Sequence, residues 1–261
     1  MITSIAQYQK IINNLIKKWG IDGSTRNLWF RGQSDTNWNL LPKIYRSPFT
    51  QNNFNYEREL TRDFQLFSPQ YVSMQPTHTF EWLFLMQHHG LSTRLLDWTE
   101  SSLVALYFAV DDFEYDENSS IWILDPWSLN DCVLSESSVL TYTDTECEKY
   151  LLDLEDLDNR NNIEASFPIA IRPQKNSARI LAQKGMFTIH GKEKIPIDLL
   201  GYNLPKKFQQ LHIKKIEIDK KCKLKIKKEL YFSGITNSVL FPEIDGICRD
   251  LSFRYSSDFI N

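Results

Sequence analysis

Two short segments of this chain hold residue types that can bind an anion and support chemistry. In residues 29–33, two aromatic residues precede Arg31, Gly32 and Gln33. The guanidinium of an arginine offers planar donors that match phosphate, and glycine has no Cβ to keep a ligand or another backbone away. The pattern predicts a strand whose Arg31 anchors a phosphorylated ligand. The alternative is a structural arginine that pairs with a buried carboxylate such as Asp97.

The second segment, residues 88–99, ends in Thr93–Thr99, which is richer in polar groups than a core strand. Its polar members include Thr93, Arg94, Asp97 and Thr99. Burying such groups costs about 2–7 kcal/mol each unless they find partners. The segment is therefore an internal hydrogen-bond network or the wall of a site, and composition favours neither. His88 and His89 fit a helix cap better than a metal site, and we expect no metal ion.

No GxSxG, P-loop, GxGxxG or HExxH motif is present. The net charge is −3, so the molecule as a whole does not attract polyanions, and any contact with nucleic acid must be local. Residues 206–228 hold ten lysines. Their alternation with apolar residues predicts a strand with a solvated lysine face, and a patch that contacts nucleic acid is the alternative.

Composition predicts the compartment. No apolar run is long enough to span a membrane, and the N-terminus lacks the basic start and apolar run of a secretory signal. The four cysteines are widely spaced and form no CxxC pair. We therefore expect free thiols in a cytoplasmic protein that makes no contact with a membrane. The oligomeric state is not predicted.

Periodicity predicts the elements that position these residues. Helices are expected at 4–19, 54–67, 81–88, 101–110 and 227–234. Strands are expected at 28–31, 93–96, 121–124, 167–171 and 186–189. The result is one α+β domain over residues 1–261, with residues 127–165 as a candidate surface insertion.

The sequence resembles the FRG domain family, which takes its name from the motif seen here as Phe30-Arg31-Gly32. The resembling segments are 30–33, 38–42, 57–67, 87–90, 93–99, 105–109, Arg179, 183–187, 240–243 and 245–246.

A more distant resemblance is to ADP-ribosyltransferases of the arginine–serine–glutamate type. Those proteins place an aromatic-Arg-Gly strand first, then a strand bearing Ser or Thr, an Ala-x-x-Phe segment and a further strand. Residues 30–32, 97–99, 105–108 and 121–124 follow that order here. The resemblance implies helices packed on a split, mostly antiparallel sheet, with NAD as the substrate.

The same resemblance implies the site. Arg31, Thr99 and Gln183 would be the catalytic residues, and the NAD contacts would be Arg31, Gly32, Gln33, Asp97, Trp98, Thr99 and Tyr107. Gln183 stands where those enzymes carry a glutamate, and an amide cannot supply the negative charge that stabilises a developing cation. Transfer would then be weakened, lost or dependent on another acid, such as Glu243 or Asp97.

Two functions are consistent with these residues. One is an NAD-cleaving enzyme that transfers ADP-ribose to a protein, to nucleic acid or to water, as a toxin or antiphage effector. The other is a non-catalytic module on the same scaffold that binds a nucleotide or nucleic acid.

Overall fold

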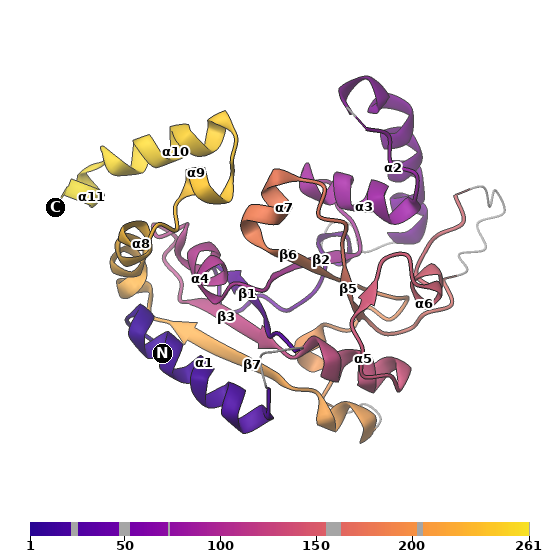
Figure 1. Ribbon diagram of the computed structural model, residues 1–261, viewed down its shortest axis with the longest axis horizontal. Coiled ribbons are helices and arrows are strands. Elements are labelled where there is room, and N and C mark those ends of the chain that lie inside the picture. The colour runs from indigo at the N-terminus through magenta and orange to yellow at the C-terminus, as the bar shows by residue number, and fades with distance from the viewer. Residues whose placement is uncertain (22–25, 47–52, 73, 155–162, 203–205, 261) are drawn as a thin grey trace.

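The computed structural model describes residues 1–21, 26–46, 53–72, 74–154, 163–202 and 206–260, and it shows helices around one seven-stranded sheet (Figure 1). The strand order is β4-β5-β6-β2-β1-β3-β7, and every pair is antiparallel except β4–β5. The strands are β1 (Trp29–Gln33), β2 (Leu95–Thr99), β3 (Ser119–Leu124), β4 (Leu140–Thr141), β5 (Ile169–Arg172), β6 (Gly185–Ile189) and β7 (Ile213–Ile218). The predicted α+β class with a mostly antiparallel sheet is confirmed.

Eleven α-helices lie within the described residues. They are α1 (Ile5–Trp19), α2 (Asn53–Phe67), α3 (Thr79–His88), α4 (Ser102–Val110), α5 (Pro126–Leu134), α6 (Thr145–Glu148), α7 (Ala178–Gln183), α8 (Lys223–Phe232), α9 (Asn237–Leu240), α10 (Ile244–Arg254) and α11 (Ser257–Ile260). One face of the sheet is covered by α1, α4 and α8, whereas α5 packs on the other (Figure 1).

Local signals explain the helix boundaries. In α1, the Ser4 side chain accepts a hydrogen bond from the backbone N–H of Gln7, and Gly20 ends the helix in the left-handed conformation at φ 65°. The apolar side of α1 buries Tyr8 and Ile12 against the sheet. The helix predicted at residues 4–19 is therefore confirmed to within one residue.

The centre of the sheet opens between β1 and β2. Five consecutive residue pairs join β1 to β3, but one pair, Phe30 with Thr99, joins β1 to β2. Continued in antiparallel register, Arg31 would face Trp98 and Gly32 would face Asp97, and both pairings are absent from the described ladder. The two strands separate beyond Phe30, and the space between them forms a cleft.

Gly32 makes room for a helix. A Cβ on Gly32 would lie 2.0 Å from the carbonyl oxygen of Ala105 and 2.5 Å from the backbone nitrogen of Ala109. The glycine and these two buried alanines let α4 approach β1 closely. The sequence suggests that Gly32 admits either a ligand or another backbone. The structure shows that the backbone of α4 approaches it.

The first half of the second polar segment is an internal network. Arg94 is 1% exposed, and its Nε donates to Oε2 of Glu57 on α2. Its Nη1 donates to the carbonyl oxygen of His190 at 2.8 Å, and its Nη2 to that of Tyr150 at 2.5 Å. Glu57 Oε1 also accepts the backbone N–H of Arg94 at 3.1 Å. The strand predicted at 93–96 therefore starts later, at Leu95, because Arg94 serves this network.

Residues 127–165 contribute to the core in their described part. Leu129 and Cys132 of α5 belong to the apolar cluster on one face of the sheet, and Cys147 and Tyr150 belong to the cluster around α3. Residues 155–162 lie outside the described residues.

The lysine-rich stretch does not form one strand. Its described part includes β7 and α8, and Lys223 of α8 is fully buried, donating to the carbonyl oxygens of Ser34 and Tyr115. The prediction of a continuous solvated strand over this stretch is therefore wrong for α8. Several of its ammonium groups serve the fold.

Candidate functional site

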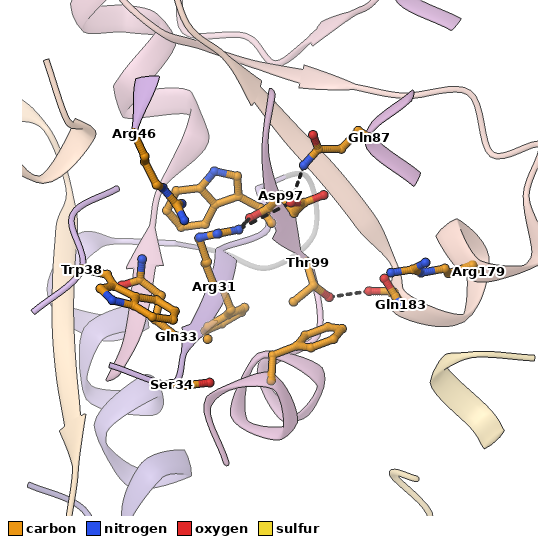
Figure 2. A pocket seen from close by; sticks show the side chains of 14 residues that line it. Arg31, Gln33, Ser34, Trp38, Arg46, Gln87, Asp97, Thr99, Arg179 and Gln183 are labelled. Atoms are coloured by element: carbon orange, nitrogen blue, oxygen red, sulfur yellow. Dashed lines mark hydrogen bonds and ion pairs between the residues drawn. The ribbon is translucent and has the colours of Figure 1, made fainter. Parts of the chain in front are cut away.

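The cleft between β1 and β2 has a volume of about 300 Å³. Figure 2 shows the side chains that line it. Because successive side chains of a strand point to opposite faces, residues of both sheet faces line the opening where the strands separate. Its charged lining residues are Arg31, Arg46, Asp97 and Arg179. Its polar ones are Gln33, Ser34, Gln87, Thr99 and Gln183, and its aromatic ones are Phe30, Trp38, Trp98 and Phe108.

Arg31 stands at the centre of the cleft (Figure 2). Its Nη1 donates to the backbone carbonyl oxygen of Asp97 at 2.7 Å and lies 3.7 Å from the Asp97 carboxylate. Its Nε is buried and has no hydrogen-bond partner among the described residues. Burial is the main cause that lowers the pKa of Arg31 to about 10; Asp97 opposes the shift, and the nearby Arg46 adds to it. Arg31 is thus a charged group at neutral pH whose donors are not all used.

Two further guanidinium groups face the same space. Arg46 donates from Nε and Nη2 to the carbonyl oxygen of Leu41, and Arg179 donates from Nη1 to that of His88. Burial lowers the pKa of both arginines, which means that their charges are incompletely solvated. Of the described lining residues, Asp97 alone is a carboxylate, so the cleft carries an excess of positive charge.

Gln33 adds a second unused donor. It is 3% exposed, and its Oε1 accepts a hydrogen bond from Trp122 Nε1 at 2.9 Å. Its Nε2 has no partner in the described part of the chain. A buried donor without a partner costs about 1–3 kcal/mol. A ligand with several acceptor oxygens would satisfy both this group and the Nε of Arg31.

The Asp97 carboxylate is held in place but remains accessible. Its side chain is 55% exposed, and its Oδ2 accepts a hydrogen bond from Gln87 Nε2 at 2.7 Å. Gln87 Oε1 in turn accepts from Thr93 Oγ1 at 2.7 Å. This chain of hydrogen bonds fixes the orientation of the carboxylate at the mouth of the cleft.

Thr99 and Gln183 meet at the far side of the cleft. Thr99 Oγ1 donates to the backbone carbonyl oxygen of Gln183 at 2.6 Å and accepts the N–H of Ser101 at 3.0 Å. Gln183 is the last residue of α7, and its Nε2 donates to the carbonyl oxygen of Leu240 at 3.1 Å. Both residues line the cleft, but their described hydrogen bonds are to protein groups.

Two of the predicted NAD contacts, Tyr107 and Trp98, offer little or no side-chain surface to the cleft. Tyr107 does not line the cleft, since it lies in the core and its hydroxyl donates to Asp111 Oδ1 at 2.8 Å. Consecutive helical residues point about 100° apart, so Phe108 reaches the cleft in its place. Trp98 is 3% exposed and donates from Nε1 to Thr188 Oγ1, which leaves little of its ring for stacking.

The sequence indicates no role for several residues of the cleft, among them Trp38, Arg46, Gln87 and Arg179. Trp38 is 45% exposed and offers the ring surface that Trp98 lacks. Trp38, Gln87 and Arg179 all stand in segments that resemble the FRG family, so a signal existed for them. Arg46 directly follows a short 3-10 helix, Lys43–Tyr45, and no local pattern indicates that it reaches Arg31.

The described residues give less support to a metal site or a catalytic histidine. Within the described residues, no group of three or more His, Cys, Asp or Glu side chains is placed to hold a metal ion. His88 Nε2 lies 4.0 Å from Glu243 Oε1, and His89 is the cap residue at the end of α3. A search of the described helices for one long and apolar enough to cross a membrane finds none.

Comparison with known families matches residues 26–118 to the FRG domain. Residues 26–118 form an FRG domain. The FRG domain begins just before β1, ends just before β3, and supplies Arg31, Gln33, Arg46 and Asp97 to the cleft. Arg179 and Gln183 come from beyond the matched range, so the FRG domain does not form the cleft alone. Searches of the curated proteins and of the solved structures gave no match.

Proposed function

We propose that the cleft binds NAD through its phosphates, and that the protein cleaves the bond between nicotinamide and ribose. The observation that carries the binding step is the pair of buried, unpartnered donors, Arg31 Nε and Gln33 Nε2, next to Arg46 and Arg179. A cavity rich in donors and positive charge favours a ligand rich in acceptors and negative charge, and a pyrophosphate meets that description.

The chemical step needs a negative charge beside the ribose. When the N-glycosidic bond breaks, its electron pair leaves with nicotinamide and positive charge develops on the ribose. Gln183 cannot neutralise that charge, and its Nε2 is already bound to Leu240. We assign the stabilising role to Asp97, the accessible carboxylate of the cleft. The acceptor, a macromolecule or water, then bonds to the ribose carbon and releases its proton to solvent.

Nicotinamide release tests this proposal. The full chain is incubated with NAD, with and without protein and nucleic-acid acceptors, and free nicotinamide is measured. Asp97→Asn keeps an acceptor oxygen for Gln87 and removes the charge, so it should lower the rate by about 10²-fold or more. Glu100→Gln is the matched control, since Glu100 lies nearby in the chain but does not line the cleft. An unchanged rate in Asp97→Asn would refute the role of Asp97.

A non-catalytic module that binds the same nucleotide is the second candidate. It is favoured by the glutamine at position 183 and by the contacts of Asp97 with Gln87 and Arg31, which offset part of its charge. This candidate predicts NAD binding by calorimetry with no release of nicotinamide under any of the conditions above. Its nucleic-acid form has less support, because Lys223 and Lys227 of the lysine-rich stretch are engaged within the fold.

The proposed setting is the cytoplasm, where the protein would act as a toxin or an antiphage effector. Expression of the wild type in bacteria should then lower cellular NAD and arrest growth. Expression of Arg31→Ala to the same level should do neither. Growth arrest by both proteins would show that toxicity does not depend on Arg31 and the cleft.

A further inference from the structure

A second pocket of about 290 Å³ lies next to the cleft, between α3 and α7. Its lining is mainly apolar and includes Phe84 and Leu85 of α3 and Ile180 of α7. Polar side chains, among them Gln174 and Asn176, stand on the segment that leads into α7. The volume and lining suit a planar ring with polar edges.

A small cavity of about 50 Å³, here called the joining cavity, shares lining residues with both this pocket and the cleft. The residues that line both this cavity and the cleft are Gln87, Asp97, Trp98, Arg179 and Gln183. Those that line both this cavity and the second pocket are Phe84, His88 and Ile180. The three spaces are therefore neighbours, with the joining cavity between the other two. Residues of α3, α7, β2 and β6 line the joining cavity.

Arg179 marks the boundary between the two compartments. It lines the cleft and the joining cavity but not the second pocket. Its Nη1 donates to the carbonyl oxygen of His88 at 3.2 Å, so the side chain extends from α7 to the end of α3. A cation at this boundary would contact the middle of any ligand that extends from one compartment to the other.

We propose, on the basis of the NAD-binding role stated above, that the two pockets form one site for a dinucleotide. The phosphates lie near Arg31 and Arg179, and one of the two rings occupies the pocket between α3 and α7. The volume of the cleft supports this arrangement, because about 300 Å³ is the lower end of the range for ligand sites. A second compartment of similar size provides room for the second nucleoside.

Calorimetry with three probes tests the inference: NAD, diadenosine diphosphate and inorganic pyrophosphate. Leu85→Glu places a charge in the second pocket only, since Leu85 lines neither the cleft nor the joining cavity. It should weaken both dinucleotides about tenfold or more and change pyrophosphate affinity less than about twofold. Leu251→Glu, a half-exposed leucine of α10 that lines none of these spaces, is the matched control and should change nothing.

The outcomes separate this inference from the proposed function. Dinucleotide affinities that Leu85→Glu leaves unchanged would overturn the two-compartment site while NAD binding stands. Equal weakening of pyrophosphate would also overturn it, because the effect would then reach the cleft itself. If diadenosine diphosphate binds with the expected sensitivity and NAD does not, the two-compartment site stands and the NAD proposal fails. Asn176→Trp, at the exposed rim of the pocket, replaces Leu85→Glu if circular dichroism shows that the latter is unfolded.

Discussion

Arg31 has both a structural contact and unused donors, so it combines the two roles that the sequence suggests, a structural arginine and an anchor for a phosphorylated ligand. Its Nη1 replaces a missing contact between β1 and β2 by donating to the carbonyl oxygen of Asp97. Its Nε, together with Gln33 Nε2, remains unsatisfied beside the cleft. An arginine that served only the fold would be expected to satisfy its buried donors within the protein. The unused donors are the reason to regard Arg31 as a ligand-binding residue.

Gly32 is a second single residue on which the structure depends, because it allows α4 to pack closely against β1. Gly32→Ala should lower the free energy of unfolding by about 1–3 kcal/mol or more, because its Cβ would collide with backbone atoms of α4 that cannot move away. Gly185→Ala is the matched control. A Cβ there would meet Ile180 Cγ2 at 3.6 Å, an ordinary contact, so we expect a change within about 0.5 kcal/mol. Urea unfolding measures both, and equal effects would show that close approach of α4 is not the constraint.

At the scale of elements, the sequence predicts helices better than the contacts between them. The helices at 4–19, 54–67 and 101–110 are found within one residue of their predicted ends, since apolar periodicity and caps are local signals. The start of β2 was misplaced because Arg94 is bound by Glu57, which is 37 residues away. Tyr107 was misassigned because α4 is apolar on all sides, so periodicity does not show which residue faces the cleft.

The ion pair between Glu57 and Arg94 joins α2 to the start of β2. Glu57→Gln should lower the free energy of unfolding by about 3–5 kcal/mol, because it leaves a buried guanidinium without a counter-charge. Glu59→Gln is the control on the same helix, where the carboxylate is exposed, and it should cost less than about 1 kcal/mol. Denaturant unfolding measures the free energy of unfolding of both variants. Similar losses in the two would contradict the structural role of this ion pair.

His190, directly after β6, links stability to pH. Burial, together with the positive charge of Arg94, lowers the pKa of His190 to about 3. In the unfolded chain, a histidine takes up its proton near pH 6.5. Between about pH 6.5 and 3 the unfolded state therefore binds more protons, and the free energy of unfolding falls as pH falls, by up to about 1.4 kcal/mol per pH unit.

His190→Gln tests this linkage. The variant should lose stability less steeply than the wild type between pH 6.5 and 5, a range above the pKa of most carboxylates. His212→Gln is the control, because His212 is partly exposed. Parallel stability curves for the wild type and His190→Gln would show that His190 does not carry the pH dependence.

At the scale of the whole molecule, the local charge of the cleft is opposite in sign to the net charge of the protein. The net charge is −3, yet three arginines converge on one cleft, and Arg179 reaches it from beyond the FRG domain. This convergence depends on the folded arrangement that brings residues 31, 46 and 179 to one cleft, which no local pattern in the sequence encodes. Segments distant in the chain therefore create an anion site that the overall charge does not indicate.

Titration of the full chain with NAD in a calorimeter, for the wild type and Arg31→Ala, tests the central claim most directly. Circular dichroism and urea unfolding verify that both proteins are folded. We predict that the wild type binds NAD and that Arg31→Ala binds about 10–100-fold more weakly, since hydrogen bonds to charged groups contribute about 1.5–3 kcal/mol. Equal affinity in the two folded proteins, or no binding by the wild type, would contradict the claim that this cleft is an NAD site.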